Sequence, residues 1–149
     1  MITEIKLGAV HGSCVDFDGK SILAIGPSGS GKSTLALNLI ALGGVLVSDD
    51  QVVLSNDKNG VIVAPPNIIS GKIEARNIGI LKCLHVNASR LNLVIDLTVA
   101  PERRMPETMF VDIGTHHVEV IAGNGVANLP IAAKLLNLFG RDYAFGSAT

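Results

Sequence analysis

Hydrophobic residues in this chain gather in short runs that are separated by polar or glycine-containing turns. The runs at residues 21–25, 45–48 and 91–97 are almost continuously apolar, as in strands that are buried on both faces of a sheet. Residues 9–17 instead alternate between apolar and polar side chains, which is typical of a strand with one exposed face. These runs predict a fold built around a sheet.

Turn signals between the runs indicate how the strands connect. Asp18-Gly19 stands between the first two runs, and an Asp-Gly pair in this setting is a strong hairpin signal. Pro65-Pro66 blocks ladder pairing after a later strand. The remaining predicted strands lie at residues 51–54, 60–64, 110–113 and 117–121.

Two segments repeat their apolar residues at helical spacing. The first, residues 34–42, is followed by Gly43-Gly44, which can supply the left-handed cap that ends a helix. The second, residues 129–139, has Pro130 near its start and Gly140 at its end, and we expect the tail from residue 141 to fray. Strands and helices together predict one α/β domain with a mixed sheet over residues 1–149.

The loop between the strand at 21–25 and the first helix is a complete phosphate-binding sequence: Gly, any four residues, Gly-Lys-Ser. Its glycines let the backbone approach a phosphate, and its N–H groups favour an anion. Lys32 would reach the terminal phosphates, and Ser33 is placed to hold Mg²⁺. This predicts binding of ATP or another polyphosphate without naming the reaction. The expected nucleotide-binding residues are Gly26, Pro27, Ser28, Gly29, Ser30, Gly31, Lys32, Ser33 and Thr34.

Two adjacent carboxylates, Asp49 and Asp50, follow the buried strand at 45–48. A short strand soon after a phosphate loop commonly ends in an acid that is linked to Mg²⁺. We therefore expect this pair in the active site, with Asp49 near the metal. Asp96, in the strand at 91–97, is a rival, and a pair of solvated turn acids is the alternative without function.

Three further side chains are candidates because of their neighbours. Glu74 and Arg76 lie two positions apart in an apolar stretch, so on one strand they would face the same side. They predict either a functional surface or a surface ion pair, because burying opposite charges needs further partners. His11 lies on the strand expected beside the strand at 21–25. It is either a site residue or a structural core or edge histidine whose hydrogen bonds are made within the protein. His116 and His117 would point to opposite faces, which does not favour a shared metal.

Composition narrows the function classes. The 149 residues, 48% of them hydrophobic, are enough for one folded domain. A net charge of −1 and an aromatic content of 3% argue against nucleic-acid binding. The chain has no apolar run long enough for a membrane span, and its first residues are too polar for a signal peptide. Cys14 and Cys83 lack metal-ligand spacing, so we expect core cysteines in a reducing, cytoplasmic setting.

Taken together, residues 10–12, 26–33, 46–50 and 71–80 resemble the catalytic, C-terminal domain of bacterial HPr kinase/phosphorylase. The stretch Ile-Glu-x-Arg-x-x-Gly-Ile is the most specific part, because phosphate loops are common. The resemblance implies a mixed-sheet fold like that of phosphoenolpyruvate carboxykinase. It also implies phosphate transfer from ATP, with Mg²⁺, to a serine of the phosphocarrier protein HPr, which many members reverse with inorganic phosphate.

The resemblance further implies roles for single residues. Asp50 matches the acceptor of the serine hydroxyl proton, and Glu74 matches a Mg²⁺ ligand. With Asp49 from the strand pattern, the expected metal site consists of Ser33, Asp49 and Glu74. The residues that match catalytic positions are His11, Lys32, Asp50, Arg76 and Arg104. Arg103 is a nearby rival for the role of Arg104.

Three features depart from the resembled family. Most members carry an additional N-terminal domain, whereas this chain begins almost at the catalytic domain, as short proteobacterial forms do. Asn77 replaces the usual glycine after the signature arginine. Gly123-Asn124-Gly125 stands where an arginine-bearing loop tied to dephosphorylation is expected, so we expect phosphate-dependent dephosphorylation to be weak.

Two other functions stay open. A small-molecule kinase with the same loop would need a lid, and nothing after Pro101 predicts a long one. A regulatory domain that senses a nucleotide without turnover would tolerate the loss of Asp50. We also expect a homo-oligomer, because the resembled family forms hexamers. In addition, the helix over residues 131–139 carries more apolar side chains than one small core needs.

Overall fold

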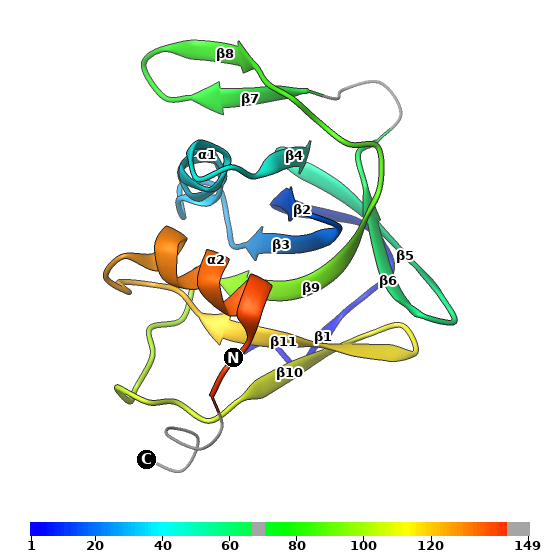
Figure 1. Ribbon diagram of the computed structural model, residues 1–149, viewed down its shortest axis with the longest axis vertical. Helices are drawn as coiled ribbons and strands as arrows, with labels where there is room; N and C mark the ends of the chain where they lie inside the picture. The colour runs from blue at the N-terminus through cyan, green and yellow to red at the C-terminus, as the bar shows by residue number, and fades with distance from the viewer. Residues whose placement is uncertain (67–70, 143–149) are drawn as a thin grey trace.

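The computed structural model describes residues 1–66 and 71–142, and within them more residues lie in strands than in helices (Figure 1). The main mixed sheet has nine strands in the order β1-β10-β11-β9-β3-β2-β5-β6, with β4 paired to β2, among these described residues. The strands are β1 (Glu4–Ile5), β2 (Gly8–Phe17), β3 (Lys20–Ile25), β4 (Val45–Ser48), β5 (Gln51–Asp57), β6 (Gly60–Ala64), β7 (Lys72–Ala75), β8 (Gly79–Lys82), β9 (Ser89–Asp96), β10 (Met109–Ile113) and β11 (His116–Ala122); the helices are α1 (Lys32–Ala41) and α2 (Leu129–Phe139).

Five of these strands pair in a closed ring. β9 pairs in parallel with β3, β3 pairs with β2, β2 with β5, and β5 with β6. β6 then returns to β9 through Ile62↔Arg90 and Val63↔Ser89, so the ring has no free edge. Alternate residues fill its interior, including Cys14 and Val94, which are 0% exposed. The expectation that Cys14 is a core residue is confirmed.

The two helices cover the outer face of the ring. Val15, Ile22, Leu93 and Ile95 alternate with the interior residues and pack with both helices in a second apolar cluster. α1 begins two residues before the predicted start, directly after Gly31 in a left-handed conformation with φ 97°. Gly43 has φ 103°, and thus ends the helix as predicted.

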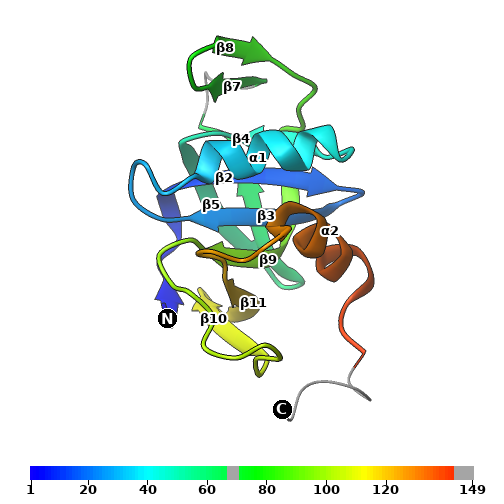
Figure 2. The ribbon, with the colours of Figure 1, turned by 90° about the vertical axis from the view of Figure 1, so that its left-hand side faces the viewer.

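The β7–β8 hairpin forms a separate two-stranded sheet that stands off the main body beyond α1 and β4 (Figures 1 and 2). The apolar stretch over residues 73–81 does not form a single strand, on which Glu74 and Arg76 would have faced the same side. A turn interrupts it at Asn77, whose φ is 68°, and the Ile78 amide donates to the Ala75 carbonyl at 3.0 Å. Glu74 therefore lies on β7, whereas Arg76 begins the turn.

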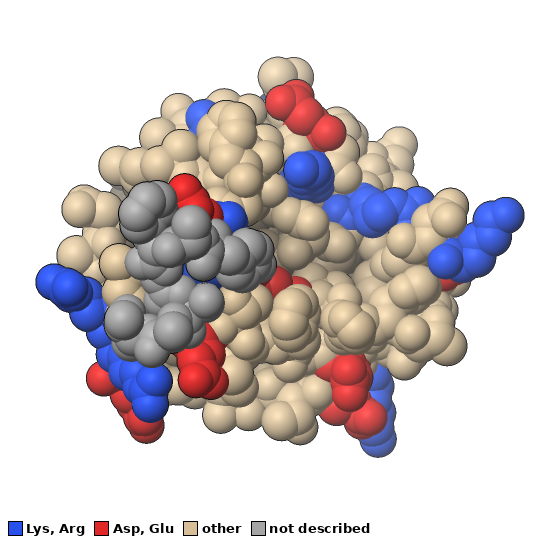
Figure 3. All heavy atoms as spheres, turned by 60° about the horizontal axis from the view of Figure 1, so that its bottom comes forward, with Lys and Arg blue, Asp and Glu red and all other residues tan. Residues whose placement is uncertain are grey.

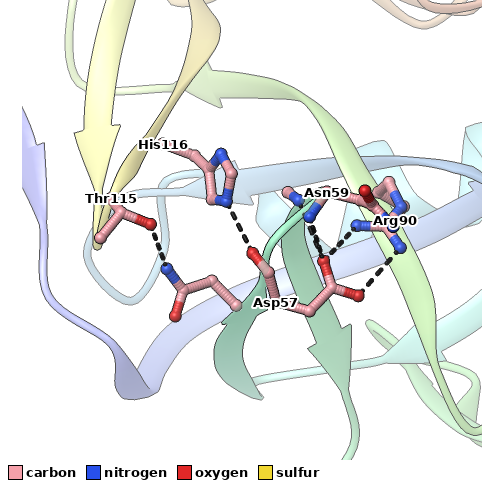
Figure 4. Close-up of polar contacts among 7 residues, drawn as sticks. Asp57, Asn59, Arg90, Thr115 and His116 are labelled. Carbon is pink, nitrogen blue, oxygen red and sulfur yellow. Dashed lines mark hydrogen bonds and ion pairs between the residues drawn. The ribbon is translucent and has the colours of Figure 1, made fainter.

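A polar cluster, the Asp57 clasp, ties the β5–β6 turn to β9 and β11 (Figure 4). Arg90 donates to both carboxylate oxygens of Asp57, at 3.0 and 3.2 Å. The Asn59 amide donates to the same carboxylate at 2.8 Å, and His116 Nε2 lies 2.7 Å from the Asp57 carbonyl oxygen. The Arg90 guanidinium and then the Asn59 amide lower the pKa of Asp57 to about 2.

The remaining predictions are mostly confirmed. The Asp18-Gly19 turn joins β2 to β3, with Phe17 opposite Lys20. The predicted hairpin of β10 and β11 is present. The frayed tail was placed too early, because Arg141 donates to Glu119 at 2.8 Å and that ion pair is largely buried. Residues 143–149 of the predicted tail lie outside the described part of the chain.

Candidate active site

Side chains from four separate segments meet around one cavity of about 480 Å³, a volume within the usual range for small-ligand sites. The segments are β2, the loop between β3 and α1, the turn after β4, and the β7–β8 hairpin. The lining residues are His11, Gly26, Pro27, Ser28, Gly29, Gly31, Lys32, Ser33, Thr34, Asp50, Glu74 and Arg76. Most of the residues selected from the sequence are therefore close together in space.

The loop over residues 26–33 is shaped by its glycines. Gly29 and Gly31 have φ of 83° and 97°, which other residues adopt at a cost. A Cβ on Gly26 would lie 2.5 Å from Ser30 Oγ, so a side chain there would displace the loop. The N-terminus of α1 has no side-chain cap, so its N–H groups and helix dipole favour an anion at this end of the cavity.

Lys32 is the buried cation of the loop. Its side chain folds back so that Nζ donates to the carbonyls of Gly26 at 2.7 Å and Pro27 at 3.0 Å, and the residue is 9% exposed. Carbonyl oxygens satisfy an ammonium only as neutral acceptors, whereas a phosphate oxygen adds opposite charge in a poorly solvated place. The lysine is therefore positioned to exchange a carbonyl for a phosphate oxygen.

The adjacent acids Asp49 and Asp50 have different surroundings. Asp49 Oδ1 accepts from Ser13 Oγ at 2.7 Å and Ser33 Oγ at 2.8 Å, and its Oδ2 accepts from the Glu74 amide at 3.2 Å. Asp50 adopts φ 70°, is exposed and lines the cavity. Within the described part of the chain its carboxylate has no hydrogen-bond partner. Asp49 is thus occupied with protein donors, whereas Asp50 is free to accept a proton from a bound molecule.

Asp96, the rival of Asp50, does not line this cavity. It ends β9 opposite Ile25 of β3, is 4% exposed, and accepts from the Thr98 amide at 3.0 Å and the Thr98 hydroxyl at 2.6 Å. These local bonds satisfy the carboxylate where it is buried. The geometry therefore favours Asp50, as the sequence analysis did.

Arg76 and Glu74 reach the cavity from the hairpin, and exposed His11 reaches it from β2, where it pairs with Gln51. Arg104 does not: it lies exposed in the connection between β9 and β10, outside the lining residues. Its rival Arg103 lines a different cavity, of about 380 Å³. Within one chain the structure does not bring either arginine to the site.

One polar residue of this region, Ser13, was not predicted from the sequence. It is 2% exposed and donates to Asp49. The signal was present, because a serine inside an apolar strand needs a hydrogen-bond partner when it is buried. The partner itself, 36 positions away in the chain, follows only from the pairing of β2 with β4.

A family model described as the HPr Serine kinase C-terminal domain matches residues 5–133 of this chain. An HPr kinase/phosphorylase of Bacillus cytotoxicus is 34% identical over 112 residues, which make up 70% of this chain and 36% of that protein. The corresponding protein of Lacticaseibacillus casei is 35% identical over 111 residues, 72% of this chain and 35% of that protein. This chain thus spans about a third of the length of these curated relatives.

A solved structure, that of the Hpr(Ser) kinase/phosphatase from Coxiella burnetii, has a similar fold. The TM-score is 0.73 at 27% sequence identity, and the match covers 86% of this chain and 92% of that one. The α/β fold with a mixed sheet is therefore shared with a structure of this class.

Proposed function

The chain belongs to the HPr serine kinase C-terminal domain family, and we propose that it is an ATP- and Mg²⁺-dependent kinase that phosphorylates a serine of HPr. The observation that supports this best is the cavity that collects Lys32, Asp50 and Arg76 from three segments. We further propose that the loop over residues 26–33 is a working phosphate-binding loop and that the fold is of the phosphoenolpyruvate carboxykinase type.

Phosphate transfer requires positioning, charge neutralisation and an acceptor for the hydroxyl proton. The N–H groups of the loop and Lys32 would hold the transferred phosphate, and Arg76 would neutralise charge from the opposite wall. Asp50 would accept the proton as the serine oxygen bonds to phosphorus and the bond from phosphorus to the ADP oxygen breaks. His11, on the same cavity wall, would help to position the reacting groups.

The oxygen donors of the cavity fit Mg²⁺. Residues 1–66 and 71–142 contain no cluster of three acidic, cysteine or histidine side chains that could hold a metal by itself. Mg²⁺ is commonly bound by one or two protein oxygens, with waters and nucleotide phosphates completing its shell. Ser33 and Glu74, both lining the cavity, would supply the protein oxygens, and the bound metal would neutralise phosphate charge.

The decisive experiment incubates the protein with labelled ATP, Mg²⁺ and HPr from the same source. Transfer of label to HPr, lost in Lys32→Ala, supports the proposal. Label on a small molecule in a cell extract would instead indicate a small-molecule kinase. Tight ATP binding without transfer to any acceptor, unchanged in Asp50→Asn, would indicate a nucleotide-sensing domain.

We propose that the reverse reaction with inorganic phosphate is weak. Two anions held close together need cations between them. The turn at Gly123-Asn124-Gly125, fixed through the Gly123 amide to Asp96 and the Asn124 amide to Val99, carries no positive charge. Pyrophosphate release from phosphorylated HPr and millimolar phosphate, compared with the forward rate, tests this; comparable rates would contradict it.

We also propose a cytoplasmic homo-oligomer, with six subunits as the size to test. On α2, Ile131 is 52%, Leu135 is 53% and Phe139 is 79% exposed, which is much apolar surface for one short helix. Light scattering at micromolar concentration would reject the oligomer if it gave a monomer mass.

We propose that the partner is not a nucleic acid. On the face shown in Figure 3, charged side chains of both signs are scattered around a broad uncharged area. None of the helices in the described part of the chain is long and apolar enough to cross a membrane.

A further inference from the structure

Asp49 joins three segments that are distant in sequence. One carboxylate oxygen accepts from Ser13 of β2 and from Ser33 at the start of α1, at 2.7 and 2.8 Å, and the other accepts from the backbone of Glu74 in β7, at 3.2 Å. Each of the two oxygens therefore has at least one protein donor.

The third of these contacts matters most, because the hairpin has few other attachments. β7 and β8 pair with each other alone. Within residues 1–66 and 71–142, the bond from the Glu74 amide to Asp49 is the only hydrogen bond from either hairpin strand to another element. The buried side chain of Ile73, 2% exposed, adds apolar contact with the cluster under α1.

The Asp49 carboxylate also acts electrostatically on Cys83, at the base of the hairpin. Burial, and secondarily the Asp49 carboxylate, raise the pKa of Cys83. Cys83 follows β8 directly, and its amide donates to Gly71 at 3.0 Å, at the base of the hairpin. The carboxylate is therefore close to the place where the hairpin joins the body of the protein.

We propose that Asp49 is a positioning residue that holds the β7–β8 hairpin over the phosphate loop, rather than a direct ligand of Mg²⁺. By accepting the hydrogen bond that the Ser33 hydroxyl donates, Asp49 leaves the lone pairs of the Ser33 oxygen available on the cavity side. By accepting from the Glu74 backbone, it fixes the segment that brings Glu74 and Arg76 to the cavity. The same carboxylate thus sets the distance between the loop and the opposite wall. The role in catalysis rests on the proposed kinase function, whereas the contact itself does not.

The test measures amide hydrogen exchange by NMR on the protein alone, with chelator and without nucleotide. In Asp49→Ala, we expect the amides of Ile73, Glu74 and Ala75 to exchange at least about tenfold faster, as for the loss of a charge-assisted hydrogen bond. The buried β6 amides of Val61 and Val63 serve as the internal control for folding and should not change. Asp49→Asn keeps a neutral acceptor and should restore part of the protection.

The matched control is Ser13→Ala. It removes one donor from the Asp49 carboxylate but leaves the oxygen that faces Glu74 in place. Hairpin exchange in this variant should stay near that of the unmodified protein. If it rose as much as in Asp49→Ala, the effect would be a general loosening around β2 and the proposal would fail.

A second measurement separates positioning from metal ligation. Mn²⁺ binding in the presence of ATP is followed by electron paramagnetic resonance in Asp49→Asn and in Glu74→Gln. The proposal would be overturned if hairpin amide exchange were unchanged in both Asp49 variants while Asp49→Asn lost Mn²⁺ affinity as Glu74→Gln does. Asp49 would then be a metal ligand. Because the exchange arm needs neither HPr nor turnover, its outcome is independent of whether the kinase proposal holds.

Discussion

The molecule contains two hairpins, β5–β6 and β7–β8, that are constrained very differently. β5–β6 pairs with β2 on one side and with β9 on the other, and the Asp57 clasp holds its turn. β7–β8 pairs only within itself and is attached through Ile73 and the Asp49 carboxylate. This hairpin also exposes apolar surface: Ile78 in the turn is 76% and Ile80 in β8 is 64% exposed.

This difference indicates which part of the site is fixed. Strands with ladders on both sides open only when the ring opens, whereas an element with few bonds and few buried contacts opens locally. The cavity combines the two kinds of wall, since Lys32 and Asp50 come from the main body and Glu74 and Arg76 from the hairpin. Substitutions of site residues in the main body should therefore nearly abolish phosphate transfer, whereas substitutions in the hairpin should reduce its rate by smaller steps.

The largest effect is expected from Lys32→Ala. The ammonium is buried against the loop carbonyls, so its charge acts on phosphate in a poorly solvated place. We expect phosphate transfer to HPr to fall by at least about 1,000-fold, with the melting temperature nearly unchanged. A transfer rate close to that of the unmodified protein would show that the loop does not bind the reacting phosphate.

The next largest effect is expected from Asp50→Asn. Loss of the proton acceptor should reduce transfer by at least about 100-fold, while ATP binding, measured by calorimetry, persists. Asp96→Asn is the matched control: Asp96 is held by Thr98 outside the cavity, so its change should alter stability more than turnover. The reverse ranking of the two variants would move the catalytic acid to β9.

The main body was predictable from sequence, and the hairpin was not. The loop over residues 26–33, its strand and its helix follow from local glycines and apolar runs. The spacing of Glu74 and Arg76 placed them on one face only if the stretch were a single strand, and nothing in the pattern marks the left-handed Asn77 turn. The closed ring and the Ser13–Asp49 bond depend on long-range pairing, which periodicity does not report. Periodicity likewise does not report that Arg104 lies away from the cavity.

The hairpin turn provides a smaller and more specific test. Asn77 has φ 68°, a conformation that asparagine tolerates, glycine adopts freely and β-branched residues resist. Asn77→Val should weaken the turn by about 1–2 kcal/mol, seen as faster exchange of the Ile78 amide that bonds to Ala75, together with a several-fold loss of transfer. Asn77→Gly is the matched variant and should change turn stability by less than about 1 kcal/mol. Equal effects of the two would show that backbone conformation at this position is irrelevant.

The smallest effect is expected at the other hairpin, from Asp57→Asn. The Arg90 guanidinium lowers the folded-state pKa of Asp57 to about 2 from an ordinary value of 3.8. A lowered pKa means that the clasp stabilises the fold above about pH 4 and that this contribution disappears as the pH falls through about 2.

The Arg90 side chain is 42% and the Asp57 side chain 40% exposed. Solvent therefore screens the pair, and the difference in melting temperature near neutral pH should be no more than about 2 °C. That difference should shrink as the pH falls toward 2, and it should also shrink in an Arg90→Gln background, which removes the partner. In all of these variants, hydrogen exchange of the Glu74 amide should be unaffected, because the Asp57 clasp lies on the ring. Within the described chain, the strands of the β7–β8 hairpin are hydrogen-bonded to the rest of the protein through Asp49 alone. A melting-temperature difference that is the same at all pH values, or a change in β7 exchange, would show that the two hairpins are not independent.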